Sequence, residues 1–256
     1  RRHRAASQML PQHPGVASNY VRDLSYVAGI DPQQVRREAD AWWPAFTAGI
    51  SPLAVRRDKD PERPLRVGFV SPDFREHAVT HFLLPLFEHH DRDRWEFTAY
   101  AAGSREDAFT ARLSGLVERW RKISAASDAA VAQQVDADQI DILIDLAGHT
   151  GENRLRIFAY QAAPLQGTFL GYPSTVGGNA IAFRLTDAVA DPPGLTDSQF
   201  SERLVRLPRC AWCYRSPVDL PPVPPRDPHR PLTFGSFNAV AKMSPVTLQL
   251  WAAVLK

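Results

Sequence analysis

The sequence predicts an α/β protein built around a Rossmann-like parallel sheet, and three observations support this fold class. Strand-like runs alternate with helical patterns of about ten residues from residue 65 onward, which is typical of βαβ units. Residues 140–146 (IDILIDL) are β-branched and nearly all apolar, as expected for a strand covered on both faces. The chain has 256 residues, 44% of them hydrophobic and 23% charged, so it can bury a sizeable core. Right-handed crossovers would then place helices on both faces of the sheet.

The pattern of residues 1–55, which precede this sheet, predicts a helical adaptor. A basic, proline-interrupted start leads into a helix over 19–28. Asp31 and Pro32 begin a second helix, because Asp accepts hydrogen bonds from orphan amides at the N-cap and Pro fits the first helical position. Apolar residues recur along this second helix at helical spacing: Val35, Ala39, Trp42, Trp43 and Phe46. Two such short helices cannot form a core by themselves, so we expect them to pack on a neighbouring domain.

Residues 56–225 carry the alternating pattern of the sheet and predict one Rossmann-like domain. A charged linker over 56–63 precedes a strand over 65–71, which prolines bound on both sides. The hydrophobic period then predicts, in chain order, a helix over 81–89, a strand over 97–101, a helix over 108–117, a strand near 123, a helix over 128–135, the strand over 140–146, a helix over 154–160 and strands over 167–170, 184–189 and 204–207.

Residues 226–256 predict the beginning of a second Rossmann-like domain. The proline-dense segment 217–231 suits a semi-rigid spacer. Residues 232–237 (LTFGSF) predict a strand, and 245–256 predict a helix without a stop signal. The apolar stripe of this helix has nothing in the sequence to cover it: Val246, Leu250 and Val254. We therefore expect the chain to end one βα unit into the second domain and, as an isolated piece, to be prone to aggregation.

Composition and charge exclude several classes of partner. The chain carries 30 Lys and Arg against 28 Asp and Glu, without a long run of one sign, so no nucleic-acid partner is expected. No apolar stretch approaches the roughly 20 residues of a membrane helix, so we expect no membrane partner and a cytoplasmic location. Cys210 and Cys213 offer only two of the four ligands of a structural zinc site, and we interpret them as packing thiols.

The loops that follow the strands are the candidate sites, because ligands of an open parallel sheet bind at the carboxyl ends of its strands. The loop after 65–71 places His77 where a helix begins. The helix dipole disfavours the charged ring there, which leaves a neutral imidazole able to accept a proton. His77 is therefore a candidate general base, and a helix cap or a core histidine is the alternative interpretation.

Two further loops are rich in glycine. After the strand over 140–146, Gly148 permits a tight turn, and His149 and Thr150 offer hydrogen-bonding groups; an ordinary strand-to-helix turn is the alternative. The turn over 171–178 (GYPSTVGG) would let backbone amides meet a ligand. Neither G-x-G-x-x-G nor G-x-x-x-x-G-K occurs in the chain, which argues against a dinucleotide oxidoreductase and a P-loop NTPase.

Asn238 and Lys242 lie between the strand predicted over 232–237 and the last helix. A lysine in this position can neutralise a diphosphate, assisted by helix-start amides, although a solvated surface lysine is the alternative. Together the loops predict an interdomain cleft with a neutral histidine on one side and a cationic phosphate holder on the other.

Four runs of the sequence carry a family resemblance. In chain order they are LRVGFVSPDFREHAVTHF, IDILIDLAGHTGENRL, APLQGTFLGYPSTVGG and SFNAVAKMSPVTLQLWAAVLK. They resemble the catalytic region of the O-linked N-acetylglucosamine transferases, a family that includes the Spindly-type protein O-fucosyltransferases. The resemblance implies that residues 65–225 form the N-terminal half of a GT-B glycosyltransferase. It also implies that residues 15–50 are similar to the helices that join a tetratricopeptide superhelix to that half.

The resemblance implies an activity and roles for particular residues. The reaction would be inverting transfer of N-acetylglucosamine from UDP-GlcNAc to Ser or Thr of protein or peptide acceptors, with no metal cofactor. His77 matches the active-site histidine proposed as the base, and Lys242 matches the lysine on the donor diphosphate, where it replaces a metal. The donor-sugar and acceptor region would be lined by His149, Thr150, Gly171, Tyr172, Pro173 and Thr175, with Asn238 on the donor side.

The sequence also departs from the family. Ala239 stands where relatives commonly carry Asn or Gln, so a polar donor contact is missing there. The family pattern implies a C-terminal catalytic half after Lys256 and tetratricopeptide repeats before Arg1, so we expect a fragment without turnover of its own. Two alternatives stay open: a protein O-fucosyltransferase that uses GDP-fucose, and a non-catalytic module that binds protein partners.

Overall fold

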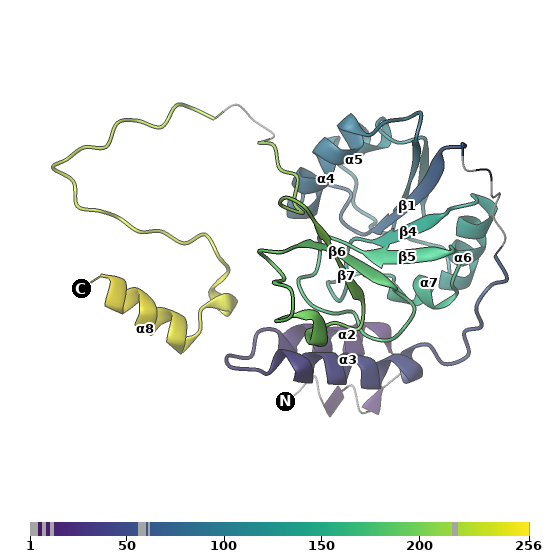
Figure 1. Cartoon of the computed structure of the whole chain (residues 1–256), viewed down its shortest axis with the longest axis horizontal. Helices are drawn as coiled ribbons and strands as arrows, with labels where there is room; N and C mark the ends of the chain where they lie inside the picture. The colour runs from purple at the N-terminus through teal and green to yellow at the C-terminus, as the bar shows by residue number, and fades with distance from the viewer. Residues whose placement is uncertain are drawn as a thin grey trace.

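A seven-stranded parallel sheet forms the centre of the computed structural model, which describes residues 5–6, 9–10, 13–55, 60, 62–216 and 220–255. The strand order is β3-β2-β1-β4-β5-β6-β7, and every neighbouring pair is parallel (Figure 1). The strands are β1 (Leu65–Ser71), β2 (Trp95–Ala101), β3 (Arg119–Lys122), β4 (Ile142–Asp145), β5 (Leu165–Thr168), β6 (Phe183–Asp187) and β7 (Arg203–Leu207). The predicted α/β class with a parallel sheet is confirmed.

Helices cover the sheet on both faces. On one face lie α4 (Ala78–His89) and α5 (Ala108–Ser114), whose side chains share a buried cluster with Phe69 of β1. On the other face lie α6 (Asp128–Ala137) and α7 (Leu155–Ala159), in a second cluster with Leu143 of β4. Because β1 and β4 are covered on both sides, their apolar runs are buried almost throughout, as parallel strands require.

The connection between β5 and β6, residues 169–182, contains no helix along its fully described length. The adaptor helices α2 (Pro14–Leu24) and α3 (Pro32–Phe46) pack on each other at this end of the molecule (Figure 1), and α3 contacts the 3₁₀ turn over Asp197–Gln199 before β7. Trp42, Trp43 and Phe46 belong to the same buried cluster as α7 and the apolar residues of this connection. The expectation that the adaptor packs on a neighbour is confirmed.

Close approach between α3 and the connection depends on two glycines. Gly177 and Gly178 have φ of +80° and +71°, a region that side chains disfavour. A Cβ at Gly177 would lie 2.7 Å from the backbone of Ala39, and one at Gly178 would lie 2.2 Å from the ring of Trp43. The Gly178 amide also donates to Asp40 Oδ1 at 2.9 Å. The glycine pair therefore seats α3, which differs from the ligand-contacting role that the sequence suggested.

Helix ends follow the local capping chemistry. The α3 start agrees with the prediction, since the Asp31 side chain accepts from Gln33 N at 3.0 Å and Pro32 fills the first helical position. A first helix is present as predicted, but its predicted bounds of 19–28 were wrong, because α2 begins at Pro14 under a His13 cap and ends at Leu24. The helix predicted to end at 117 stops at Ser114, where Gly115 follows at the C-cap.

The tail contains the one predicted strand that the structure contradicts. Residues 232–237 form no strand, because a strand needs a neighbour to complete its ladder and the described residues supply none. Phe234 and Phe237 are exposed as a result. The last helix, α8 (Pro245–Val254), agrees with its prediction, and its stripe of Val246, Leu250 and Val254 is exposed.

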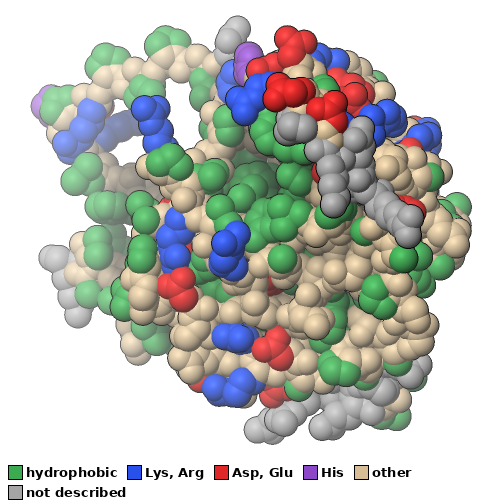
Figure 2. Space-filling model, turned by 45° about the vertical axis from the view of Figure 1, so that its right-hand side comes forward, with side chains coloured by type: hydrophobic (Ala, Val, Ile, Leu, Met, Phe, Trp, Pro, Cys, Tyr) green, Lys and Arg blue, Asp and Glu red, His purple; other side chains and the backbone are tan. Residues whose placement is uncertain are grey.

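Figure 2 shows charges of both signs on one face of the molecule, with many of the acidic side chains gathered near its upper edge. The whole sequence carries 30 basic and 28 acidic residues. Within the described ranges, no helix combines the length and the apolar character that crossing a membrane requires.

Candidate functional site

The strand order creates a topological switch point between β1 and β4. From β1 the chain moves outward through β2 and β3, and it then returns to continue from β4 through β7 in the other direction. Loops that leave neighbouring strands at such a point diverge and form a crevice at the carboxyl edge of the sheet. The loops after β1, β4 and β5 carry the candidate residues His77, His149 and Tyr172.

A cleft of about 440 Å³ lies where the loops after β4 and β5 meet the adaptor and the tail. The loops contribute Thr150, Gly171, Tyr172 and Pro173, and the tail contributes Lys242 and Ser244. The adaptor forms the remaining wall with Arg22, Ser25, Tyr26, Val27 and Ala28. Five residues predicted from the sequence are therefore brought together, whereas the wall from the adaptor was not predicted.

The two loops approach so closely only because both carry glycine. A Cβ at Gly171 would lie 1.8 Å from the Leu146 carbonyl oxygen, and one at Gly148, whose φ is +52°, would lie 2.4 Å from Tyr172 Cβ. Tyr172 is buried, and its hydroxyl lies 3.3 Å from Ser25 Oγ of the adaptor. Burial raises the pKa of the Tyr172 hydroxyl, which therefore stays neutral and able to donate.

Lys242 ends a short 3₁₀ helix (Val240–Lys242) directly before α8. The Ser244 side chain caps α8 by accepting from Thr247 N at 3.2 Å. The exposed ammonium group and the partial positive charge of the α8 N-terminus thus stand at the same cleft, with Arg22 on the adaptor wall. Arg22 also pairs with Asp23 at 3.4 Å. This combination suits an anionic ligand such as a diphosphate.

His77 lies in the loop after β1 and is not among the residues that line the cleft. It is the N-cap of α4, and its Nδ1 accepts from Val79 N at 3.3 Å. Asp73 Oδ2 lies 3.8 Å from the same nitrogen. With Nδ1 accepting, the neutral ring carries its proton on Nε2. A base acting through Nε2 therefore needs the other tautomer, with Nδ1–H turned toward Asp73.

His149 is fully buried and bridges the adaptor and the loops. Its Nε2 lies 2.9 Å from the Val176 carbonyl oxygen, which can only accept, so Nε2 carries the proton and Nδ1 accepts from Ser18 Oγ at 3.0 Å. Asn153 Nδ2 in turn donates to Ser18 Oγ at 3.2 Å. In this structure the ring contacts protein groups and lines none of the cleft, which differs from the position that the resemblance implied.

Burial lowers the pKa of His149 to about 4. An unfolded histidine titrates near 6.5, so between these values the unfolded state binds more protons and the free energy of unfolding falls as the pH falls. The loss is complete near pH 4 and amounts to about 3 kcal/mol. Urea unfolding of the wild type should give a lower free energy of unfolding at pH 4.5 than at pH 7. In His149→Gln this difference between the two pH values should be smaller by about 2 to 3 kcal/mol. An equal pH dependence in both proteins would contradict the assignment.

The remaining predicted residues lie outside the cleft. Thr175 is buried under the loop, where its Oγ1 donates to Glu202 Oε2 at 2.7 Å. Asn238 is exposed in the tail, and its backbone amide donates to Ser236 Oγ at 3.4 Å. Cys210 and Cys213 are free and exposed, so the interpretation as packing thiols was wrong.

Sequence patterns missed three buried charged residues near the loops. Asp145 accepts from Gly148 N at 2.8 Å and from Thr168 Oγ1 at 2.7 Å, and burial raises the pKa of its carboxyl. Arg184 and Glu202 contact the loop over 171–178 from β6 and from the residue before β7. An acidic residue at the end of an apolar strand could have signalled Asp145, but no local pattern signals the other two. Among the described residues, no group of three or more His, Cys, Asp or Glu side chains is placed to hold a metal ion.

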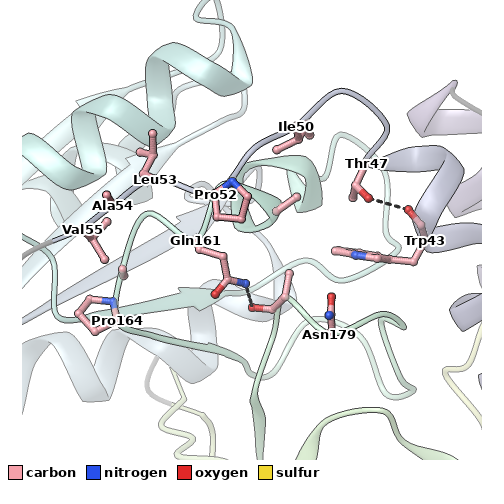
Figure 3. Close-up of a pocket in the computed structure, with 13 residues that line it drawn as sticks. Trp43, Thr47, Ile50, Pro52, Leu53, Ala54, Val55, Gln161, Pro164 and Asn179 are labelled. Carbon is pink, nitrogen blue, oxygen red and sulfur yellow. Dashed lines mark hydrogen bonds between the residues drawn. The ribbon is translucent and has the colours of Figure 1, made fainter.

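A second pocket, of about 640 Å³, lies away from the cleft. Figure 3 shows this pocket between the end of α3, the segment 50–55 and the turn before β5. Because that turn leads into β5, the pocket lies at the amino edge of the sheet. Its hydrogen-bonding side chains include Thr47, which donates to the Trp43 carbonyl at 3.0 Å, and Gln161, which donates to the Ala180 carbonyl at 3.4 Å. Among the described residues, the side chains that line it are all uncharged.

Known proteins resemble this chain in both sequence and structure. The sequence model of glycosyl transferase family 41 matches residues 51–213. The probable UDP-N-acetylglucosamine–peptide N-acetylglucosaminyltransferase SPINDLY of Arabidopsis thaliana is 38% identical over 246 residues, which are 94% of this chain and 26% of the relative. The UDP-N-acetylglucosamine–peptide N-acetylglucosaminyltransferase of Caenorhabditis elegans is 36% identical over 146 residues, which are 56% of this chain and 13% of the relative.

A solved structure agrees with these relatives. A mutant O-GlcNAc transferase of Thermobaculum terrenum superposes with a TM-score of 0.91 at 37% identity, covering 99% of this chain and 48% of the solved chain. The present chain thus spans 26% of the Arabidopsis relative's length and 48% of the solved chain.

Proposed function

The chain belongs to glycosyltransferase family 41, and from that premise we propose that its complete gene product transfers N-acetylglucosamine from UDP-GlcNAc to Ser or Thr hydroxyls of proteins. The observation that carries the proposal is the cleft in which Lys242 and the N-terminus of α8 face Thr150, Gly171, Tyr172 and Pro173. The curated relatives named above are described as peptide N-acetylglucosaminyltransferases, which supports the donor and the acceptor class.

In the proposed reaction, the acceptor hydroxyl oxygen attacks the anomeric carbon while the bond from that carbon to the diphosphate breaks. We assign the hydroxyl proton to His77, which lies outside the cleft in the loop after the neighbouring strand β1, and the electron pair of the broken bond goes to the departing diphosphate oxygen. Lys242 and the α8 N-terminus stabilise this negative charge, so the step is proposed to need no metal ion. Contact with the donor sugar is assigned to Thr150, Tyr172 and Pro173, and Asn238, which is exposed in the tail outside the cleft, is assigned to the donor side.

The roles of the domains follow from the same proposal. Residues 56–225 form the N-terminal catalytic half, and the adaptor over 1–55 joins it to acceptor-binding repeats. Residues 226–256 lead into a second half that binds the nucleoside. Because that half lies outside this chain, residues 1–256 alone should show no turnover.

A donor comparison tests the proposal. The complete gene product is incubated with an acceptor peptide and either UDP-GlcNAc or GDP-fucose, with and without EDTA, and the peptide is analysed by mass spectrometry. We expect addition of one N-acetylhexosamine from UDP-GlcNAc at the same rate in EDTA. Addition of a deoxyhexose alone would make the protein a fucosyltransferase. No addition from either donor would favour a non-catalytic binding module.

A further inference from the structure

The loop over 171–178 supplies the floor of the cleft through Gly171, Tyr172 and Pro173. It belongs to the β5–β6 connection, which has no helix to satisfy its backbone groups. Buried amides and carbonyls without partners are costly, so the loop needs hydrogen bonds from elsewhere in the fold. Two buried residues of opposite charge provide them.

Glu202 anchors the second part of the loop. It is 3% exposed, and its Oε1 accepts from Val176 N at 2.7 Å while its Oε2 accepts from Thr175 Oγ1 at 2.7 Å. Thr175 Oγ1 also accepts from Gly177 N at 3.2 Å and from Ser201 N at 3.1 Å. One carboxylate therefore organises three consecutive loop residues and ties them to the start of β7.

Arg184 anchors the first part of the loop. It is 5% exposed, and its Nη1 donates to the Tyr172 carbonyl at 2.8 Å and to the Ser174 carbonyl at 3.4 Å. Its guanidinium carbon lies 5.4 Å from the centre of the Phe200 ring. A buried guanidinium that contacts loop carbonyls would be left with unsatisfied donors if the loop moved away, so the arginine resists movement of Tyr172.

We propose that Glu202 and Arg184 are positioning residues that hold the loop over 171–178 as a rigid floor opposite Lys242. This inference rests on the proposed function, since it assigns the floor to contact with the donor sugar. The Glu202 carboxylate accepts hydrogen bonds from a loop amide and a loop hydroxyl, and the Arg184 guanidinium donates to loop carbonyls. Neither residue lines the cleft, so their effect reaches the reaction only through the position of Tyr172 and its neighbours.

Glu202→Gln in the complete gene product tests whether this anchor affects the reaction rate. The amide keeps the shape but loses the charge and one acceptor, and hydrogen bonds to charged groups are among the stronger ones. We expect kcat/KM for UDP-GlcNAc to fall about tenfold, with a raised KM. The inhibition constant of UDP, which does not carry the sugar, should stay within about twofold of the wild type. Arg184→Lys keeps the charge but loses the forked geometry, and it should give the same pattern if Glu202→Gln does not fold.

Glu118→Gln is the matched control. Glu118 Oε2 also accepts a backbone amide, Phe97 N at 2.6 Å, but near the amino end of β2 and far along the sheet from the loop. The control should leave kcat/KM and the UDP inhibition constant unchanged. If Glu118→Gln lowers kcat/KM as much as Glu202→Gln does, the effect is general destabilisation and the proposal is overturned.

Amide hydrogen exchange separates this inference from the proposed function. Exchange at residues 174–178 should speed up in Glu202→Gln and stay unchanged in Glu118→Gln. Wild-type exchange in Glu202→Gln, or faster exchange with unchanged kcat/KM, would overturn the inference. If the wild-type gene product shows no transfer with any donor, the proposed function fails, and the inference of a floor for the reaction fails with it. Exchange would then still report whether Glu202 anchors the loop.

Discussion

Replacing Lys242 with methionine should lower the turnover of the complete gene product by about 100-fold or more, the effect typical of removing one preorganised donor from a developing oxyanion. Lys242 lines the cleft beside the start of α8, where methionine keeps most of the length of the side chain but not its charge. The measurement is kcat with saturating UDP-GlcNAc. Because Lys242 is exposed, the melting temperature should stay close to that of the wild type.

Lys122→Met is the control for this variant. Lys122 is exposed, as Lys242 is. It ends the edge strand β3, where it pairs with Glu106 at 2.7 Å. Its loss should leave kcat unchanged. Equal kcat values for Lys242→Met and the wild type would remove Lys242 from the diphosphate site and leave it a surface lysine.

Replacing His77 with asparagine should lower kcat by about 100- to 10,000-fold, the range for loss of a positioned general base. Asparagine is a strong N-cap, so it replaces the Nδ1 contact with Val79 N and preserves the start of α4. Stability should therefore change by less than about 0.5 kcal/mol, which separates catalysis from folding. Both kcat and urea unfolding are measured on the complete gene product.

The chain provides a matched histidine for comparison. His13 is also the N-cap of its helix, with Nδ1 accepting at 3.3 Å from Val16 N, three residues on, whereas His77 accepts at the same distance from Val79 N, two residues on. His13→Asn should leave both kcat and stability unchanged. If His77→Asn behaves like His13→Asn, His77 is a helix cap and the base must be sought elsewhere.

The elements of the sheet could be predicted from the sequence because their signals are local. The strand over 65–71 agrees with β1 residue for residue, and α3 begins at the Asp-Pro cap, since an apolar period and a capping pair need no distant partner. The strand predicted over 232–237 fails for the opposite reason. Its composition suits a strand, but strand formation depends on a neighbour that the described residues do not supply.

The site could be predicted only in part for the same reason. The glycine-rich loops and Lys242 lie within short recognisable runs, and the structure gathers five of these residues at the cleft. The contacts that hold them join distant segments: Ser18 with His149, and Ser25 with Tyr172. No window of the sequence contains both partners of such a pair. The sequence therefore suggested His149 as a ligand contact, whereas in the structure its buried ring connects Ser18 with the Val176 carbonyl.

The packing of the adaptor on the β5–β6 connection also limits how such proteins can be assembled from modules during evolution. Recombination in the charged segment over 56–63 would separate Trp43 from Gly178 and leave both surfaces uncovered. A viable junction must therefore fall before α2, so that the adaptor is inherited together with the sheet it covers. A different segment could be joined upstream of that point without separating α3 from the loop that it covers.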